Sequence, residues 1–201
     1  MGKEKVTFVR PYFRESDHTY TLDDKPIPGF SEIMQDLGFM DFGRIPKEVL
    51  AHAAQRGKAV HLGCQFYDRG TLEWENVDPE IKGYLQAYMR FRKAWPEKII
   101  IAEQPMANRE WGYACTPDLI AQKFEGDILV VDIKTGAPMP WHPLQTMAQS
   151  LCIIHGGLII KRCSVYLKDD GTWKPGHHKD DKNDRLDWQS IVRTYHRKHR
   201  R

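Results

Sequence analysis

The 201-residue sequence has no long apolar run and no segment that looks like a secretory signal. A transmembrane helix needs about 20 consecutive apolar residues, and no stretch approaches that length. The opening letters MGKEKVTF lack the apolar region that follows the first positive charges of a signal peptide. We therefore expect a cytoplasmic protein that does not act in a membrane.

Cysteine is scarce, and the four present are far apart, at Cys64, Cys115, Cys152 and Cys163. No CxxC pair occurs, which argues against a zinc knuckle or a local iron–sulfur motif. Each cysteine lies in an apolar segment, so we expect four reduced, buried thiols.

The net charge of +3 is too small to indicate a partner, but the basic residues are unevenly distributed. The final segment, RTYHRKHRR, has five lysines or arginines, two histidines and no acid. This composition suits a polyanionic partner, and it equally suits the solvated end of a helix.

The sequence contains no repeats, and its patterns predict an α/β (α+β) fold in which helices flank a central mixed sheet. One domain of this length can bury a full core. We expect an N-terminal hairpin and short helix at 1–45, a core at 46–168, and a C-terminal hairpin and basic helix at 169–201. The expected hairpin is 18–30, turning at Asp23–Asp24; the expected helices are 31–37 (capped by Ser31), 46–68, 79–95, 144–156 and 186–201; the expected strands are 98–106, 111–124 with a break at Pro117, 126–135, 158–167 and 172–178.

Charged residues end the most apolar of these strands, in the stretch VVDIKTG at 130–136. Asp132 and Lys134 are two residues apart, so their side chains share one face, while Val131 and Ile133 point to the other. A short hairpin through 124–127 brings Asp118 beside them. Two buried carboxylates repel each other unless a cation intervenes, and either Lys134 or a hard divalent metal can be that cation. An exposed Asp–Lys pair on an edge strand is the simpler alternative.

A histidine points inward from the helix predicted at 46–68. Small residues and His61 share one face of this helix, which lets the helix approach the sheet closely. Such a histidine is either a hydrogen-bonded core residue or a metal ligand.

The stretch TPDLIAQKFEGDILVVDIKTG resembles the PD-(D/E)XK nuclease superfamily, especially its RecB-like and lambda-exonuclease-like branches, which include many phage proteins. The motif is literal here, as Pro117–Asp118 followed by Asp132–Ile133–Lys134. The resemblance covers roughly residues 20–167 and implies a restriction-endonuclease-like core. One departure is Lys25, which stands where the family's N-terminal hairpin has glycine.

The resemblance implies a role for each site residue. His61 follows Arg56–Gly57, as in this branch, and would bind Mg²⁺ or Mn²⁺ together with Asp118, Asp132 and the carbonyl of Ile133. Glu103 would support the active site, although it could equally be a solvent-facing charge on an edge strand. The implied catalytic residues are Asp118, Asp132, Lys134, Gln145 and Glu103, and the implied nucleic-acid contacts are Arg56, Trp141 and Gln149, the last standing where the family has tyrosine.

The expected function is that of a Mg²⁺- or Mn²⁺-dependent deoxyribonuclease, in particular an exonuclease used in recombination, repair or phage DNA processing. The alternatives are an inactive nucleic-acid-binding module of the same fold and a sequence-reading endonuclease. Expected partners are DNA ends or single strands, further copies of the chain, and a single-strand-annealing or other recombination protein. The expected setting is a bacterial or phage-infected cell.

Overall fold

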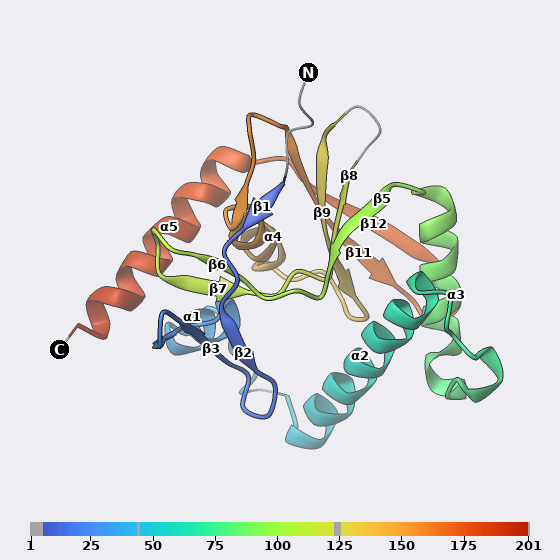
Figure 1. The fold of residues 1–201 in the computed structure, drawn as a ribbon. Helices are drawn as coiled ribbons and strands as arrows, with labels where there is room; N and C mark the ends of the chain where they lie inside the picture. The colour runs from blue at the N-terminus through green and yellow to red at the C-terminus, as the bar shows by residue number, and fades with distance from the viewer. Residues whose placement is uncertain (1–5, 44, 123–125, 201) are drawn as a thin grey trace.

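A five-stranded mixed sheet lies at the centre of the computed structural model, which describes residues 6–43, 45–122 and 126–200 (Figure 1). The strand order is β12–β11–β9–β8–β5. Only β9 and β11 run parallel; the other neighbours are antiparallel. The predicted fold class, with a mixed sheet flanked by helices, is confirmed. The strands are β5 (Lys98–Ala102), β8 (Leu119–Gln122), β9 (Ile128–Lys134), β11 (Ile160–Leu167) and β12 (Trp173–His178).

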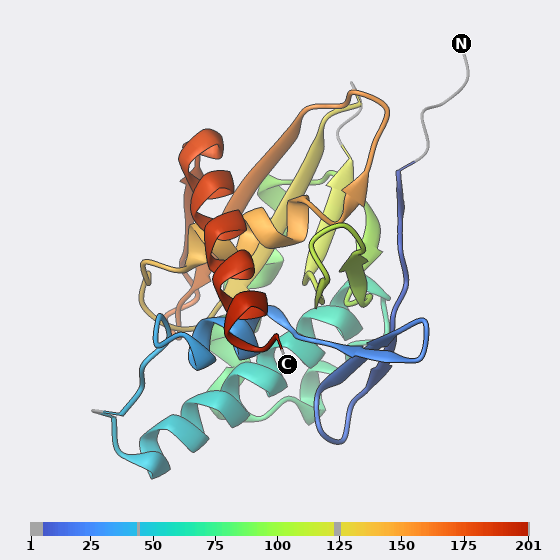
Figure 2. The same cartoon turned by 90° about the vertical axis from the view of Figure 1, so that its left-hand side faces the viewer.

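Helices cover both faces of this sheet (Figures 1 and 2). Helices α2 (Lys47–Asp68) and α3 (Pro79–Ala94) pack on one face, and a short 3-10 helix (Trp74–Asn76) connects them. Helices α4 (His142–Ser150) and α5 (Asp181–Lys198) pack on the other, with α1 (Phe30–Asp36) against α5. None of the helices in the described part of the chain is both long and apolar enough to cross a membrane.

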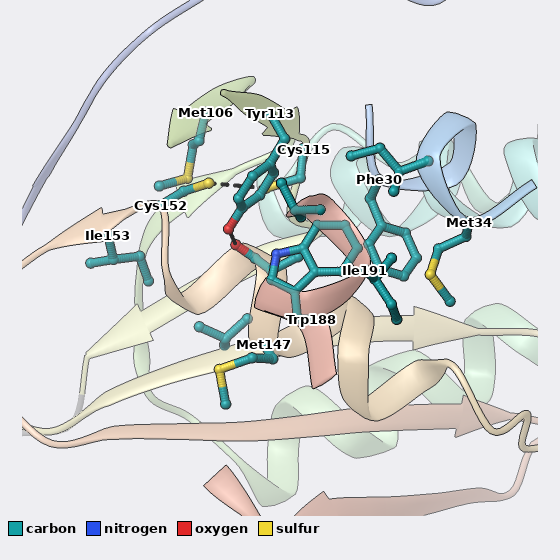
Figure 3. Packing of buried hydrophobic residues seen from close by; sticks show 14 of the residues in the cluster. Phe30, Met34, Met106, Tyr113, Cys115, Met147, Cys152, Ile153, Trp188 and Ile191 are labelled. Carbon is teal, nitrogen blue, oxygen red and sulfur yellow. Dashed lines mark hydrogen bonds between the residues drawn. The ribbon is translucent and has the colours of Figure 1, made fainter. Parts of the chain in front are cut away.

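Strand β9 is buried on both faces because it lies in the middle of this three-layer arrangement. Val131 and Ile133 pack towards α2 and α3, whereas Ile128 and Val130 pack towards α4 and α5. Figure 3 shows the second of these cores, where Met147 of α4 and Trp188 of α5 lie together. Because side chains alternate along a strand, Asp132 points to the α4 face.

In the described part of the chain, three small sheets lie around the central one. The predicted hairpin is confirmed as β3 (Thr19–Leu22) and β4 (Lys25–Ile27), with Asp23 and Asp24 both at positive φ, as in a tight two-residue turn. Strand β2 (Tyr12–Arg14) extends this hairpin. The other two sheets pair β1 (Thr7–Phe8) with β10 (Ile153–Ile154) and β6 (Met106–Asn108) with β7 (Tyr113–Cys115).

Several predicted boundaries were wrong. The cap of α1 is Gly29, not Ser31: its N–H donates to the Glu32 carboxylate, and a Cβ at Gly29 would lie 3.0 Å from the Tyr20 ring. The helix predicted at 144–156 begins at His142 and ends at Ser150, because the next residues pair with β1. Helix α5 starts at Asp181 rather than 186, since Asp180 accepts a hydrogen bond from the Asn183 N–H.

The predicted break at Pro117 is confirmed, because the strand predicted at 111–124 forms β7 and β8. The prediction of one strand at 98–106 was wrong, because this segment is split into β5 and the start of β6. Residues 124 and 125 of the predicted turn at 124–127 lie outside the described residues, and so does Arg201, the last residue of the basic end. All four cysteines are free and buried. The sulfur atoms of Cys115 and Cys152 lie 3.6 Å apart (Figure 3). The single-domain organisation stays a prediction.

Candidate metal and catalytic site

Two aspartates are brought together at one end of the β8–β9 pair. Asp118 immediately precedes β8, whose next residue, Leu119, lies opposite Val131 of β9. The Asp118 carboxylate accepts a hydrogen bond from the backbone N–H of Ile133, which ties it to the neighbouring strand. Asp132 is only 1% exposed. The literal motif of the sequence therefore lies in one buried place.

Lys134 and helix α4 surround the Asp132 carboxylate. The Lys134 ammonium lies 2.6 Å from Oδ2 of Asp132 and donates a 2.9 Å hydrogen bond to the Gln145 amide oxygen. Gln149, one turn further along α4, donates a 3.2 Å hydrogen bond to the other oxygen of Asp132. Residues four apart share a helix face, so α4 directs two amides at the same strand end.

His61 and Glu103 complete the cluster on the other side of Asp118. The His61 Nδ1 atom lies 3.2 Å from Oδ1 of Asp118 and 3.5 Å from Oε1 of Glu103. Glu103 has φ of 49°, a left-handed conformation that is rare for this residue type. Its N–H faces the carbonyls of Pro117 and Asp118, at 3.1 and 3.2 Å. Residues held in such conformations concentrate at functional sites, because the surrounding structure must impose them.

The two aspartates have opposite electrostatic environments. Burial acts to raise the pKa of Asp118, but His61, and then Lys134, outweigh it and the pKa is lowered. Burial prevails at Asp132 and raises its pKa, although Lys134 acts in the other direction. Burial acts to lower the pKa of Lys134, yet the two aspartates raise it. For His61, Asp118 and Glu103 likewise overcome burial and raise the pKa well above its usual value.

These residues offer a suitable ligand set for a hard divalent cation. One ligand atom each from His61, Glu103 and Asp118 can be chosen so that all lie within 4.8 Å of one another. Oδ2 of Asp132 is buried and, within the described part of the chain, accepts no well-formed hydrogen bond beyond its ion pair with Lys134. A set rich in carboxylate oxygens with one imidazole suits Mn²⁺ and, with more water ligands, Mg²⁺. His61, Glu103 and Asp118 therefore fit a hard divalent cation, whereas Asp132, the other aspartate that the sequence pattern implies as a ligand, is not part of this group.

Two predicted nucleic-acid contacts, Arg56 and Trp141, each pack against an aromatic ring. The Arg56 guanidinium stacks over the Tyr84 ring of α3 at 5.5 Å and approaches Glu80 at 4.0 Å. Trp141 packs edge-on against Phe42, with 5.8 Å between ring centroids, and contacts the α4–α5 core. Trp111 is partly buried against the same core.

Strand β11 supplies polar neighbours that sequence analysis missed. Ser164 and Tyr166 lie in register with Asp132 and Lys134 on the parallel neighbouring strand, so their side chains share that face. The Tyr166 hydroxyl lies 2.9 Å from Nδ1 of His142. Burial, and then the charge of Lys134, lowers the pKa of His142 to about 3. The alternation of polar residues along 160–167 was the available signal.

Comparison with known proteins gives little further information. No protein-family model and no curated protein matches the chain. Among solved structures, an alkaline exonuclease from Laribacter hongkongensis is similar over 73% of this chain and 79% of its own, with 19% sequence identity and a TM-score of 0.42. A similarity of this size does not bear on function, which must be argued from the site.

Proposed function

We propose that this chain is a metal-dependent deoxyribonuclease that hydrolyses phosphodiester bonds. The observation that carries the proposal is the meeting of Asp118, Asp132 and Lys134 at one end of the β8–β9 pair, with His61 beside them. Two carboxylates, an ammonium and an imidazole in one partly buried place are the groups that phosphodiester hydrolysis requires. They must hold a cation, orient a water molecule and balance charge on phosphorus.

Asp118, Asp132 and His61 would hold the metal, with Glu103 at their side and the Ile133 carbonyl as a further ligand. A bound Mg²⁺ or Mn²⁺ supplies a polarised phosphate oxygen and a water molecule of lowered pKa. The contact between Asp118 and the Ile133 N–H fixes the carboxylate, so that the site is preorganised before the substrate arrives.

Lys134 would act as a fixed positive charge. Its ammonium is anchored by Asp132 and Gln145, and only 21% of the side chain is exposed. The charges of Asp132 and Asp118 raise the pKa of Lys134 in the structure without metal. Its charge would orient the attacking water and offset the negative charge that develops on the phosphate.

The narrower form of the proposal is an exonuclease that acts on DNA ends in recombination, repair or phage DNA processing, inside a bacterial or phage-infected cell. It rests on the sequence resemblance, as do assembly with further copies of the chain and pairing with a recombination protein. The second candidate is an inactive nucleic-acid-binding module. The complete set of acids and lysine favours hydrolysis over that candidate.

The test is incubation of linear, nicked and closed circular DNA, single- and double-stranded, with Mg²⁺, Mn²⁺ or EDTA. We expect hydrolysis that needs a divalent cation and spares closed circles. Cleavage of closed circles would indicate an endonuclease rather than an exonuclease. Absence of cleavage on every substrate would overturn the proposal that this chain is an enzyme.

Two variants locate the activity within the site. Asp118→Asn should abolish hydrolysis, whereas Lys161→Met should not, because Lys161 is a surface lysine on β11 that pairs with Asp127. Equal activity of Asp118→Asn and the wild type would show that Asp118 is not required for hydrolysis.

A further inference from the structure

A positively charged groove lies between α5 and the turn that joins β6 to β7 (Figure 1), and none of the candidate metal ligands lines it. It is an open groove of about 860 Å³. One acid, Glu110, lies along it, against four arginines. The residues that define the groove are Arg109, Trp111, Arg193, His196, Arg197 and Arg200.

The wall of the groove opposite α5 is firmly built. Gly112 has φ of 66°, and a Cβ there would lie 3.3 Å from Nε2 of His196, so the turn approaches the helix closely. The same His196 atom donates a 3.0 Å hydrogen bond to the Trp111 carbonyl. The Trp111 N–H in turn donates to the Asn108 side chain, whose amide donates to the Leu151 carbonyl. These contacts hold turn and helix together as two sides of one channel.

Three arginines at the C-terminal end of α5 remain available for a ligand. Arg193 and Arg197 lie four residues apart on one face of α5, Arg200 lies just beyond Lys198, where the helix ends, and all three are exposed. Across residues 6–43, 45–122 and 126–200, no carboxylate lies within ion-pair distance of any of them. By contrast, Lys198 and His199 on the same helix end both contact Asp36, at 3.0 and 3.1 Å.

A solvated helix end does not explain this arrangement completely. The helix dipole favours cations in the last turn of a helix, which accounts for Arg197 but not for Arg193, one turn earlier. Nor does it account for Arg109, which reaches the groove from a different element. Arg109 is held there by Asp23 in an exposed pair, which an incoming anion can replace.

We propose that this groove binds the sugar–phosphate backbone of DNA at a second place, outside the metal site. Guanidinium groups bind phosphate through paired hydrogen bonds. Arg193 and Arg197 lie ~6 Å apart along α5 at 1.5 Å per helical residue, the length of about two nucleotide steps of one strand, and Arg200 follows beyond the helix end. The hydroxyls of Ser190 and Thr194 already donate to carbonyls one turn back, so the arginines are the donors. The choice of DNA rests on the proposed function; the binding of a phosphate backbone does not.

The experiment measures binding in EDTA, so that no hydrolysis occurs, by fluorescence anisotropy of a labelled linear duplex and of its single strand at several salt concentrations. The groove variant is Arg193→Gln with Arg197→Gln and Arg200→Gln. Glutamine is a good helix former, and circular dichroism checks the fold. The matched control removes the same charge from the opposite end of α5, through Lys179→Gln, Lys182→Gln and Arg185→Gln, all exposed residues outside the groove.

We expect the groove variant to bind the duplex ~10²-fold more weakly at about 0.1 M salt, and the slope of log K against log salt to fall by roughly 2 to 3, one phosphate contact per arginine. The control should remain within a few-fold of the wild type. Equal losses in both variants would reveal an effect of net charge alone and overturn the proposal. If the triple variant does not fold, Arg193→Gln alone should lower the slope by roughly 0.9.

Two further arms separate the ligands and the hypotheses. An equal loss on an RNA duplex assigns the groove to the shared backbone, whereas unchanged DNA binding with lost binding to anionic lipid vesicles overturns it. If the wild type binds DNA through the arginines but does not cleave it, the proposed nuclease activity is wrong and the proposed binding groove is supported. If the wild type cleaves DNA and the groove variant binds and cleaves it equally well, the proposed binding groove is wrong and the nuclease activity is supported.

Discussion

Replacement of Lys134 by methionine probes the site most directly. Methionine keeps an unbranched chain of similar length and removes the charge together with the hydrogen bond to Gln145. In the wild type, the ammonium lies 2.6 Å from Oδ2 of Asp132, a carboxylate that is 1% exposed. Lys134→Met therefore leaves a buried anion that, among the described residues, keeps the 3.2 Å hydrogen bond from Gln149.

The size of the effect follows from this burial. Removal of one partner of a buried ion pair costs ~3–5 kcal/mol. Because the Lys134 side chain is 21% exposed, we expect ~3 kcal/mol, the low end of that range, in the absence of metal. The double variant with Asp132→Asn should recover most of this loss, because no uncompensated charge remains. The rate of hydrolysis should fall ~10²- to 10⁴-fold, while DNA binding in EDTA stays nearly unchanged.

The pH dependence gives an independent check. Loss of Lys134 removes an influence that lowers the pKa of Asp132, so the already raised pKa rises further. A group whose folded-state pKa is raised binds its proton more tightly in the folded protein, so acidification stabilises the fold. The deficit of Lys134→Met in urea denaturation should therefore shrink as the pH falls from neutrality. Cleavage at the wild-type rate, or a deficit that does not change with pH, would refute the reasoning.

Three other predictions concern metal, core and pH. His61→Ala should weaken Mn²⁺ binding at least ~10-fold in calorimetric titration, whereas the exposed His52→Ala should leave it unchanged. Arg162→Met should cost ~3–5 kcal/mol of unfolding free energy in urea, since this guanidinium is 1% exposed and contacts two carboxylates; a loss below 1 kcal/mol would contradict it. Burial lowers the pKa of His142 to about 3 and of His178 to about 4. Stability should therefore fall as the pH drops below about 6.5, by up to ~1.4 kcal/mol per pH unit for each histidine, and a flat urea profile between pH 7 and 5 would exclude this.

Local sequence patterns predicted the parts of the site that depend on neighbours along the chain. Two-residue alternation placed Asp132 and Lys134 on one face, and the break at Pro117 placed Asp118 immediately before the next strand. Four-residue spacing placed Gln145 and Gln149 together, and both contact the β9 groups. These relations follow from the backbone geometry of a strand or helix alone, so they can be predicted from the sequence.

Boundaries and orientations that depend on distant partners could not be predicted in this way. The helix predicted to continue to 156 stops at Ser150 because Ile153 and Ile154 pair with a strand from the start of the chain. The Glu103 carboxylate faces His61 because of a positive φ, which nothing in IIIAEQPM indicates. The stacking of Arg56 on Tyr84 of the next helix was likewise not visible in the sequence, and its role as a substrate contact stays a prediction.

By itself, the sequence determined which residues share a strand or helix face, because those relations repeat every two or every 3.6 residues. It also determined the charge at the end of the chain, and hence the three arginines Arg193, Arg197 and Arg200 at the C-terminal end of α5. Only the tertiary structure decided that His61, Glu103 and Asp118 meet, and that the turn at Gly112 closes on α5 to form a groove. Those contacts join segments far apart in the chain, so they arise from the packing of helices on the sheet rather than from any local pattern.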